Sequence, residues 1–116
     1  MKVLIIGGGA SGMAAALSAA QDQSNSVVLL ERQARVGRKL LATGNGRCNL
    51  TNRDLSEAHY HGAQPRFACP ALDRMDVEKT LAAFRTLGLV TVTEPSGRVY
   101  PLSDQANSVV DVLRFA

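Results

Sequence analysis

Four residues near the N-terminus have the types and spacing of a nucleotide-binding site. Gly7, Gly9 and Gly12 form a G-x-G-x-x-G pattern directly after an apolar run. The first glycine of such a pattern allows a tight turn, the second lets a diphosphate approach the backbone, and the third lets a helix pack closely on a strand. Glu31 lies 19 residues beyond Gly12, where a carboxylate can bind a ribose hydroxyl. The four residues predict binding of a dinucleotide.

A second set of residues suited to anion binding lies between Gly37 and Asn52. Gly44, Asn45 and Gly46 favour turns, and the backbone N–H groups of such a loop can form a nest for an anion. The surrounding sequence is basic, because residues 31–53 contain six cations and one carboxylate. The cations are Arg32, Arg35, Arg38, Lys39, Arg47 and Arg53. We call residues 37–52 the basic loop, and we expect this loop and a helix N-terminus to hold a diphosphate between them.

The elements that must position these residues are a strand, a helix and a second strand. The apolar run from Val3 to Ile6 is typical of a buried, central parallel strand. A helix is expected over about Ser11–Gln21, with its N-terminal N–H groups directed at the glycine turn. The segment "VVLLE" predicts a second buried strand that ends at Glu31. This order predicts the βαβ start of a Rossmann-like α/β domain.

The glycine pattern does not distinguish FAD from NAD, since both carry an ADP half with a free ribose 2′-hydroxyl. Arg32 could border the adenine or accommodate a 2′-phosphate. Glu31 would repel such a phosphate, which disfavours NADP at this site.

The rest of the chain predicts a loop, a helix, a β-hairpin and a final helix. Asp76 is a suitable N-cap for a helix that stops at Gly88. The segments "LVTVTE" and "SGRVYP" predict a hairpin around a Pro-Ser-Gly turn. Ser103 can cap the final helix. Ala106, Val109, Val110 and Leu113 form its apolar face.

Three segments of the chain resemble a known family. "IIGGGASGMAAA", "LLERQARVGRKLLATGNGRCNLTN" and "GRVYPLSDQANSVVDVL" are similar to the N-terminal part of the BaiN-like FAD-dependent oxidoreductases, the aminoacetone-oxidase-family flavoproteins. The stretch from Gly37 to Asn52 is the most distinctive of them, because its G-R-K-L-L, G-x-G-R-C-N and L-T-N elements occur in one uninterrupted order. The resemblance implies noncovalent FAD in a glutathione-reductase-like fold.

The resemblance also implies roles for individual residues. Gly7, Gly9, Ser11 and Gly12 would hold the diphosphate. Glu31 would hold the adenosine ribose, with Arg32 beside it. The diphosphate and flavin side would be lined by Lys39, Gly44, Asn45, Gly46, Arg47, Cys48, Asn49 and Thr51.

The resembled family implies a longer protein than this chain. Its members carry a substrate domain and a C-terminal segment that closes the flavin pocket. Residues 1–116 are therefore expected to be the N-terminal part of a FAD/NAD(P)-binding domain. We expect NAD(P)H as a possible electron donor, an unknown small-molecule substrate, and poor FAD binding or self-association of the 116 residues alone. The alternative is a nucleotide-binding module that binds NAD or ADP and has no redox activity.

Composition and spacing argue against several other functions. Aromatic residues make up 4% of the chain and Trp is absent, which disfavours stacking platforms for single-stranded nucleic acid, so we expect no nucleic-acid partner. Cys48 and Cys69 match no metal or redox spacing, and we expect Cys48 to pack rather than react. The apolar run before Gly7 is too short for a signal peptide or membrane span, so a cytoplasmic protein is expected. The catalytic residues stay unknown.

Overall fold

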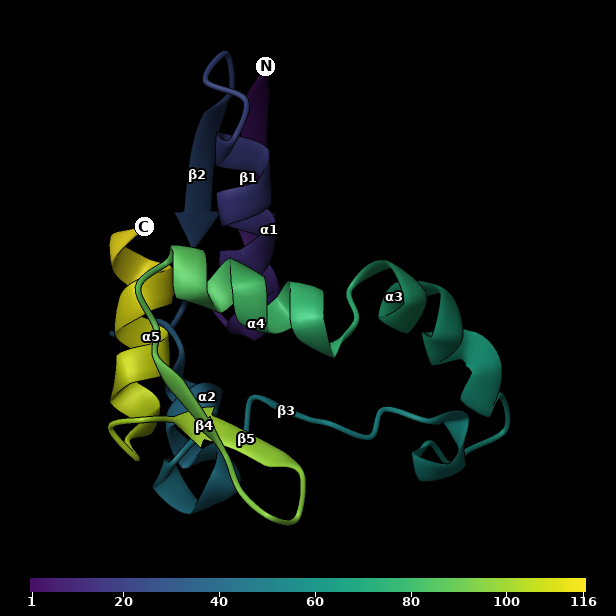
Figure 1. The fold of residues 1–116 in the computed structure, drawn as a ribbon. Coiled ribbons are helices and arrows are strands. Elements are labelled where there is room, and N and C mark those ends of the chain that lie inside the picture. Colours follow the sequence, from purple (N-terminus) through teal and green to yellow (C-terminus); the bar gives the residue numbers. More distant parts are fainter.

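The computed structural model describes residues 1–116, and the fold begins with a parallel βαβ unit. Strand β1 (Lys2–Ile6) leads through helix α1 (Ala10–Ala20) to strand β2 (Ser26–Leu30). The strands pair in parallel, from Lys2 opposite Ser26 to Ile6 opposite Leu30. They lie beside α1 at one end of the molecule (Figure 1). The predicted βαβ start is confirmed.

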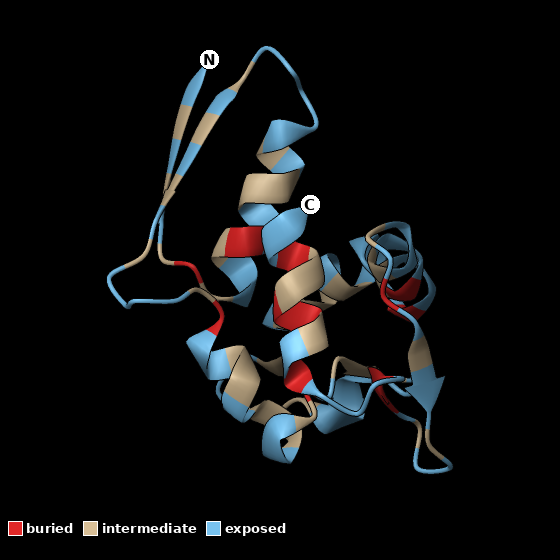
Figure 2. Ribbon diagram, turned by 90° about the vertical axis from the view of Figure 1, so that its left-hand side faces the viewer, coloured by how far each residue is buried: buried red, intermediate tan, exposed pale blue.

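The prediction that these two strands are buried on both faces is wrong for this chain. Their side chains alternate between exposed and half-buried along both strands. Ile6 is 83% exposed and Leu4 is 61% exposed, while Ile5 and Leu29 are half-buried. The physical reason is that α1 covers one face of the sheet and no element covers the other, as the blue strand segments in Figure 2 show. An apolar sheet face is therefore left in contact with solvent.

A second sheet is antiparallel and contains the predicted hairpin. Strands β4 (Thr91–Thr93) and β5 (Arg98–Pro101) pair around the turn that ends at Gly97, with Val92 opposite Tyr100. A third strand, β3 (Thr51–Asn52), pairs with β5 on its other side. The sequence pattern did not predict β3. The pairing places the end of the basic loop directly against the hairpin.

Helix α4 (Val77–Thr86) has the predicted cap at each end. The Asp76 carboxylate accepts a hydrogen bond from the Lys79 N–H group at 2.8 Å. At the other end, Gly88 has a φ of +90°. Gly88 N–H donates to Arg85 O at 2.9 Å, and Leu89 N–H donates to Phe84 O at 2.9 Å. This pair of bonds is a Schellman motif, which ends the helix and turns the chain toward β4.

Helix α5 (Ala106–Phe115) supplies more buried hydrophobic residues than any other element. All four residues of its predicted apolar face are buried. The largest buried cluster joins three of them to α1, the basic loop and the start of the hairpin: Met13, Cys48, Leu89, Ala106, Val109 and Leu113. The prediction that Ser103 caps α5 is wrong, because Gln105 occupies the N-cap position. The Ser103 hydroxyl instead lies 2.7 Å from that of Ser108, so it bonds a side chain within the first turn.

The remaining elements are short. They are α2 (Arg38–Ala42), the 3-10 turns η1 (Thr43–Gly46), η2 (Glu57–His59) and η3 (Pro65–Ala68), and helix α3 (Cys69–Arg74). The predicted connection over residues 56–75 contains three of them, and α3 lies away from the body of the fold (Figure 1). No helix combines the length and the apolar character that crossing a membrane requires. Helix α2 and the turn η1 pack against α5.

Candidate nucleotide-binding site

The glycine turn between β1 and α1 has the geometry that its pattern predicts. Gly7 has a φ of +100°, a conformation that favours glycine. A Cβ atom on Gly12 would lie 1.8 Å from Gly7 O, so only glycine lets α1 approach the strand this closely. A Cβ atom on Gly9 would meet no atom within 4 Å. The space over Gly9 is therefore open for a ligand.

The N-terminus of α1 is free to bind an anion. Gly9 is its N-cap and offers no side-chain acceptor, and the first turn contains no acidic residue. The first N–H groups of a helix have no partner within it, and they carry the positive end of the helix dipole. Ser11 is exposed on this first turn. A diphosphate would find unpaired N–H donors at this end of the helix.

Gly8, which is not one of the predicted site residues, joins the turn to its surroundings. Its N–H group donates to the Glu31 carboxylate at 2.7 Å, and its carbonyl accepts from Gly37 N–H at 2.7 Å. A Cβ atom here would lie 2.6 Å from a methyl carbon of Val36. Gly8 therefore joins the turn to the end of β2 and to the start of α2. The run of three consecutive glycines was the only sequence signal for this role.

Glu31 lies at the end of β2 with both carboxylate oxygens hydrogen-bonded. Oε1 accepts from Gln33 N–H at 2.7 Å and Oε2 accepts from Gly8 N–H at 2.7 Å. Both N–H groups lower the pKa of Glu31, and the Gln33 N–H group has the larger effect. Glu31 is therefore a carboxylate at neutral pH. Each oxygen of a carboxylate can accept a further bond. Glu31 can therefore still accept from a ribose hydroxyl, and Arg32 beside it is exposed.

These features meet in one polar groove of about 430 Å³. Its lining residues are Gly8, Gly9, Glu31, Gln33, Arg38, Lys39 and Ala42. The Arg38 guanidinium donates to the Gln33 amide oxygen at 2.8 Å, which places that cation beside the groove. The groove thus combines a helix N-terminus, a carboxylate and two cations. It suits a ligand with a diphosphate next to a sugar.

Residues 44–51 form the predicted turn but do not line this groove. Gly44, Asn45 and Gly46 have φ angles of +54°, +57° and +83°, so the backbone here is left-handed. Asn45 and Gly46 are exposed. A Cβ atom on Gly44 would lie 2.6 Å from Asn49 N, so this turn is closed by a near contact that requires glycine. The groove therefore joins Lys39 to the glycine turn and leaves the second half of the basic loop outside.

Arg47 is directed at other protein groups. Its guanidinium donates to Glu94 at 2.7 Å and to Asp104 at 2.5 Å. It also lies over the ring of the buried Tyr100, with its central carbon 3.9 Å from the ring centroid. The Glu94 and Asp104 carboxylates raise the pKa of Arg47. Its charge is therefore already paired within the protein.

The last three predicted residues of the loop have structural contacts. Cys48 is buried in the core with a φ of +58°, and burial raises the pKa of its thiol. In the amide orientation that satisfies its neighbours, Asn49 donates to Thr51 O at 2.9 Å and to Val99 O at 3.2 Å. Thr51 pairs with Val99 between β3 and β5. These contacts join the loop to the hairpin.

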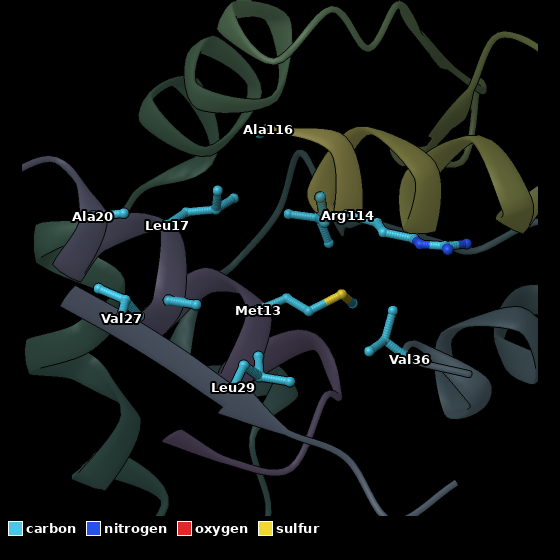
Figure 3. A pocket seen from close by; sticks show the side chains of 10 residues that line it. Met13, Leu17, Ala20, Val27, Leu29, Val36, Arg114 and Ala116 are labelled. Atoms are coloured by element: carbon cyan, nitrogen blue, oxygen red, sulfur yellow. The ribbon is translucent and has the colours of Figure 1, made fainter. Parts of the chain in front are cut away.

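A second groove, of about 320 Å³, is apolar and lies between α1, β2 and the end of α5. Met13 and Val36 point toward each other across it (Figure 3). Nine of its ten lining residues are hydrophobic. Arg114 is its one polar lining residue, and no helix N-terminus or side-chain carboxylate lines it beside that cation. The polar groove, which combines these groups, is therefore the candidate nucleotide site.

Comparisons with known proteins agree with this geometry. The family model described as "HI0933-like protein Rossmann domain" matches residues 1–116. The chain is 47% identical over 115 residues to a 3-dehydro-bile acid delta(4,6)-reductase of Clostridium scindens, covering 98% of this chain and 28% of that protein. It is 30% identical to the ribosomal RNA dihydrouridine synthase of Haemophilus influenzae and 32% identical to that of Escherichia coli, covering 96% and 95% of this chain and 27% of each relative.

The chain thus spans little more than a quarter of the length of these relatives. The family match covers all of the segments on which the predicted resemblance rested, and it confirms that resemblance. Together with the βαβ unit and the glycine turn, it shows that this chain belongs to the HI0933-like Rossmann domains, nucleotide-binding domains of a family whose members include oxidoreductases.

Proposed function

We propose that this chain is the FAD-binding portion of a flavin-dependent oxidoreductase. The observation that carries the proposal is the polar groove, because it brings the free N-terminus of α1, the Glu31 carboxylate and Lys39 together. A diphosphate next to a ribose matches these three groups in chemistry. Residues 1–116 would then be the N-terminal part of a FAD/NAD(P)-binding domain.

The residues in and around the groove would each bind or position a part of the ADP half of the cofactor. The N–H groups that follow Gly9, with the Ser11 hydroxyl, would bind the diphosphate, and Gly7 and Gly12 would shape the turn. Lys39 would supply a positive charge on the other side. Glu31 would accept from the adenosine ribose, with Arg32 bordering the adenine.

The left-handed turn would lie toward the flavin. Asn45 and Gly46 expose backbone there, while Cys48, Asn49 and Thr51 join the turn to the core and the hairpin. Bound flavin would supply hydride transfer, with NAD(P)H as its reductant, and the protein would supply binding and orientation. No side chain of this chain is assigned as a general acid or base.

The substrate class is proposed to be a small molecule. One relative is named for a bile acid and two for ribosomal RNA. Two of the six cations in residues 31–53 are paired within the protein, Arg47 with Glu94 and Arg53 with Glu78. Fewer charges are then free for a phosphate backbone, so we expect weak, strongly salt-dependent RNA binding at most. Tight binding of a ribosomal RNA fragment at physiological salt would contradict this part of the proposal.

A nucleotide-binding module without redox chemistry is the second candidate. The observation in its favour is that, of the residues predicted to line the diphosphate and flavin side, only Lys39 lines the polar groove. Competition calorimetry with ADP, NAD and FAD separates the two candidates. Equal affinity for all three ligands supports the module, and a clear preference for FAD supports the flavoprotein.

The direct test is the visible spectrum of the purified protein, expressed as its gene encodes it. We expect flavin absorption, or binding when FAD is added. Absence of both would overturn the proposal. Gly9→Val is a matched control, since its side chain would fill the open space over the turn and should abolish binding.

A further inference from the structure

Arg47 connects its own loop to the segment from Glu94 to Asp104, which lies 47 to 57 residues later in the sequence. Its guanidinium bonds to Glu94, which follows β4, and to Asp104, which lies between β5 and α5. Its third partner is the Tyr100 ring in β5, which is only 5% exposed. Arginine suits this position because its planar guanidinium can stack on a ring while its edge donates to two carboxylates. We call Arg47, Glu94, Tyr100 and Asp104 the Arg47 cluster.

The cluster joins two segments with left-handed backbone. Asn45 and Cys48, which flank Arg47, have φ angles of +57° and +58°, and Asp104 has a φ of +59°. These are the three non-glycine residues with positive φ. Such residues are strained and persist where their surroundings hold them in place. The Arg47–Asp104 bond ties one strained segment to the other.

The charge of the cluster argues against a role in binding phosphate directly. Glu94 and Asp104 carry two negative charges against the single positive charge of Arg47. A diphosphate brought to this guanidinium would meet the two carboxylates at hydrogen-bond distance from it. Like charges at such distances repel. Arg47 is also absent from the polar groove.

We propose that Arg47 is a positioning residue, which holds the turn from Gly44 to Cys48 in its left-handed shape against the hairpin for the flavin half of FAD. This proposal rests on the proposed function, and it assigns Arg47 a different role from that of Lys39. Lys39 serves the diphosphate in the polar groove. Arg47 serves the flavin side through the loop that it holds.

The test compares FAD affinity with ADP affinity in variants of the protein as its gene encodes it. We expect Arg47→Met to weaken FAD binding about tenfold and to leave ADP binding unchanged, since the polar groove is intact. The double variant Glu94→Gln, Asp104→Asn should weaken FAD binding in the same way. Arg47→Lys should not restore affinity, because an ammonium cannot stack and donate as the guanidinium does. Arg53→Met removes a nearby exposed ion pair and serves as the matched control.

Two outcomes would overturn the proposal. If Arg47 binds the diphosphate directly, Arg47→Met weakens ADP and FAD alike, Arg47→Lys restores part of both, and the double variant leaves both unchanged or tighter. If the cluster only stabilises the fold, the variants lower the melting temperature and leave the affinity of the folded protein for FAD unchanged.

A second measurement tests the cluster even if the protein binds no FAD, the result that would refute the proposed function. Amide hydrogen exchange of residues 44–49 should speed up at least tenfold in Arg47→Met, while exchange in α1 stays unchanged. Unchanged exchange in the turn would refute the positioning role on its own.

Discussion

Gly12 and Gly7 approach each other so closely that a Cβ atom on Gly12 would lie 1.8 Å from the carbonyl oxygen of Gly7. The contact is with backbone, which cannot rotate away as a side chain could. It sets the distance between α1 and β1, and with it the position of the helix N-terminus over the turn. A Cβ atom on Gly9, three residues earlier, would meet no atom within 4 Å.

This difference predicts that substitution of Gly12 mainly lowers the stability of the protein, whereas substitution of Gly9 mainly weakens ligand binding. Gly12→Ala should destabilise the protein by at least about 3 kcal/mol through overpacking. Gly9→Ala should cost no more than about 1 kcal/mol, as a poorer N-cap, since its φ of −79° suits any residue. It should nevertheless weaken ADP and FAD binding at least about tenfold by filling the approach to the backbone. Denaturant unfolding and calorimetry measure the two effects, and equal destabilisation would contradict the assignment.

Lys39 should contribute its charge to diphosphate binding. We expect Lys39→Gln to weaken ADP binding about tenfold, or about 1.4 kcal/mol, with a larger effect at low salt. Arg35→Gln is the matched control, because the Arg35 guanidinium donates to Asn107 on α5 and does not line the groove. Calorimetry at two salt concentrations provides the measurement. A similar loss in both variants would indicate a general charge effect in place of a specific site.

The two cysteines should differ in reactivity. Cys48 is 3% exposed and burial raises its pKa, whereas Cys69 is half-buried. Because the thiolate is the reactive form, an alkylating reagent at pH 8 should modify Cys69 first and Cys48 only after denaturant is added. Mass spectrometry of digested samples locates the label. Rapid modification of Cys48 in the folded protein would favour a redox role over packing.

Asp76 should stabilise α4 in a pH-dependent way. The Lys79 N–H group lowers the pKa of Asp76 below its ordinary value of 3.8. A lowered pKa means that the stabilisation is fully present above the unfolded value and is lost as the pH falls through the folded value. Asp76→Ala should therefore lower the melting temperature by a few degrees above about pH 5, and this difference should shrink below about pH 4. Asp73→Ala is the control, since this exposed carboxylate caps no helix.

The uncovered face of the β1–β2 sheet should make the 116 residues associate when expressed alone. Leu4, Ile6, Val28 and Leu30 are all about half exposed or more. We expect sedimentation velocity to show concentration-dependent oligomers that Ile6→Lys with Val28→Lys reduces. Phe67→Ser is the control at an exposed apolar residue outside this face. A monomer at all concentrations would contradict the prediction.

Much of the fold follows from signals that lie close together in the sequence. The glycine turn, the Asp76 cap, the Gly88 stop and the buried face of α5 each depend on residues within one or two helical turns of one another. Their conformations are set by local sterics and local hydrogen bonds. The sequence was therefore sufficient for the βαβ start, the hairpin and the final helix.

Burial of the two parallel strands was not decided by local signals. An apolar run of four or five residues is compatible with cover on one face or on both. Only the tertiary structure shows that α1 covers a single face. The Ser103 cap failed for a local reason: the hydroxyl bonds to Ser108, five residues on, and the helix begins later, after Gln105.

The candidate site also combines features that the sequence predicts with features that depend on tertiary structure. The residue types and spacing alone were enough to associate Gly7, Gly9, Gly12 and Glu31 with a nucleotide. The partners of Arg47 lie 47 and 57 residues away along the chain, at Glu94 and Asp104. Which cation of the basic loop stays free and which is paired depends on the folding of the hairpin and α5 onto that loop. The sequence by itself determined the chemistry of the loop, and only the tertiary structure decided which charges are left for a ligand.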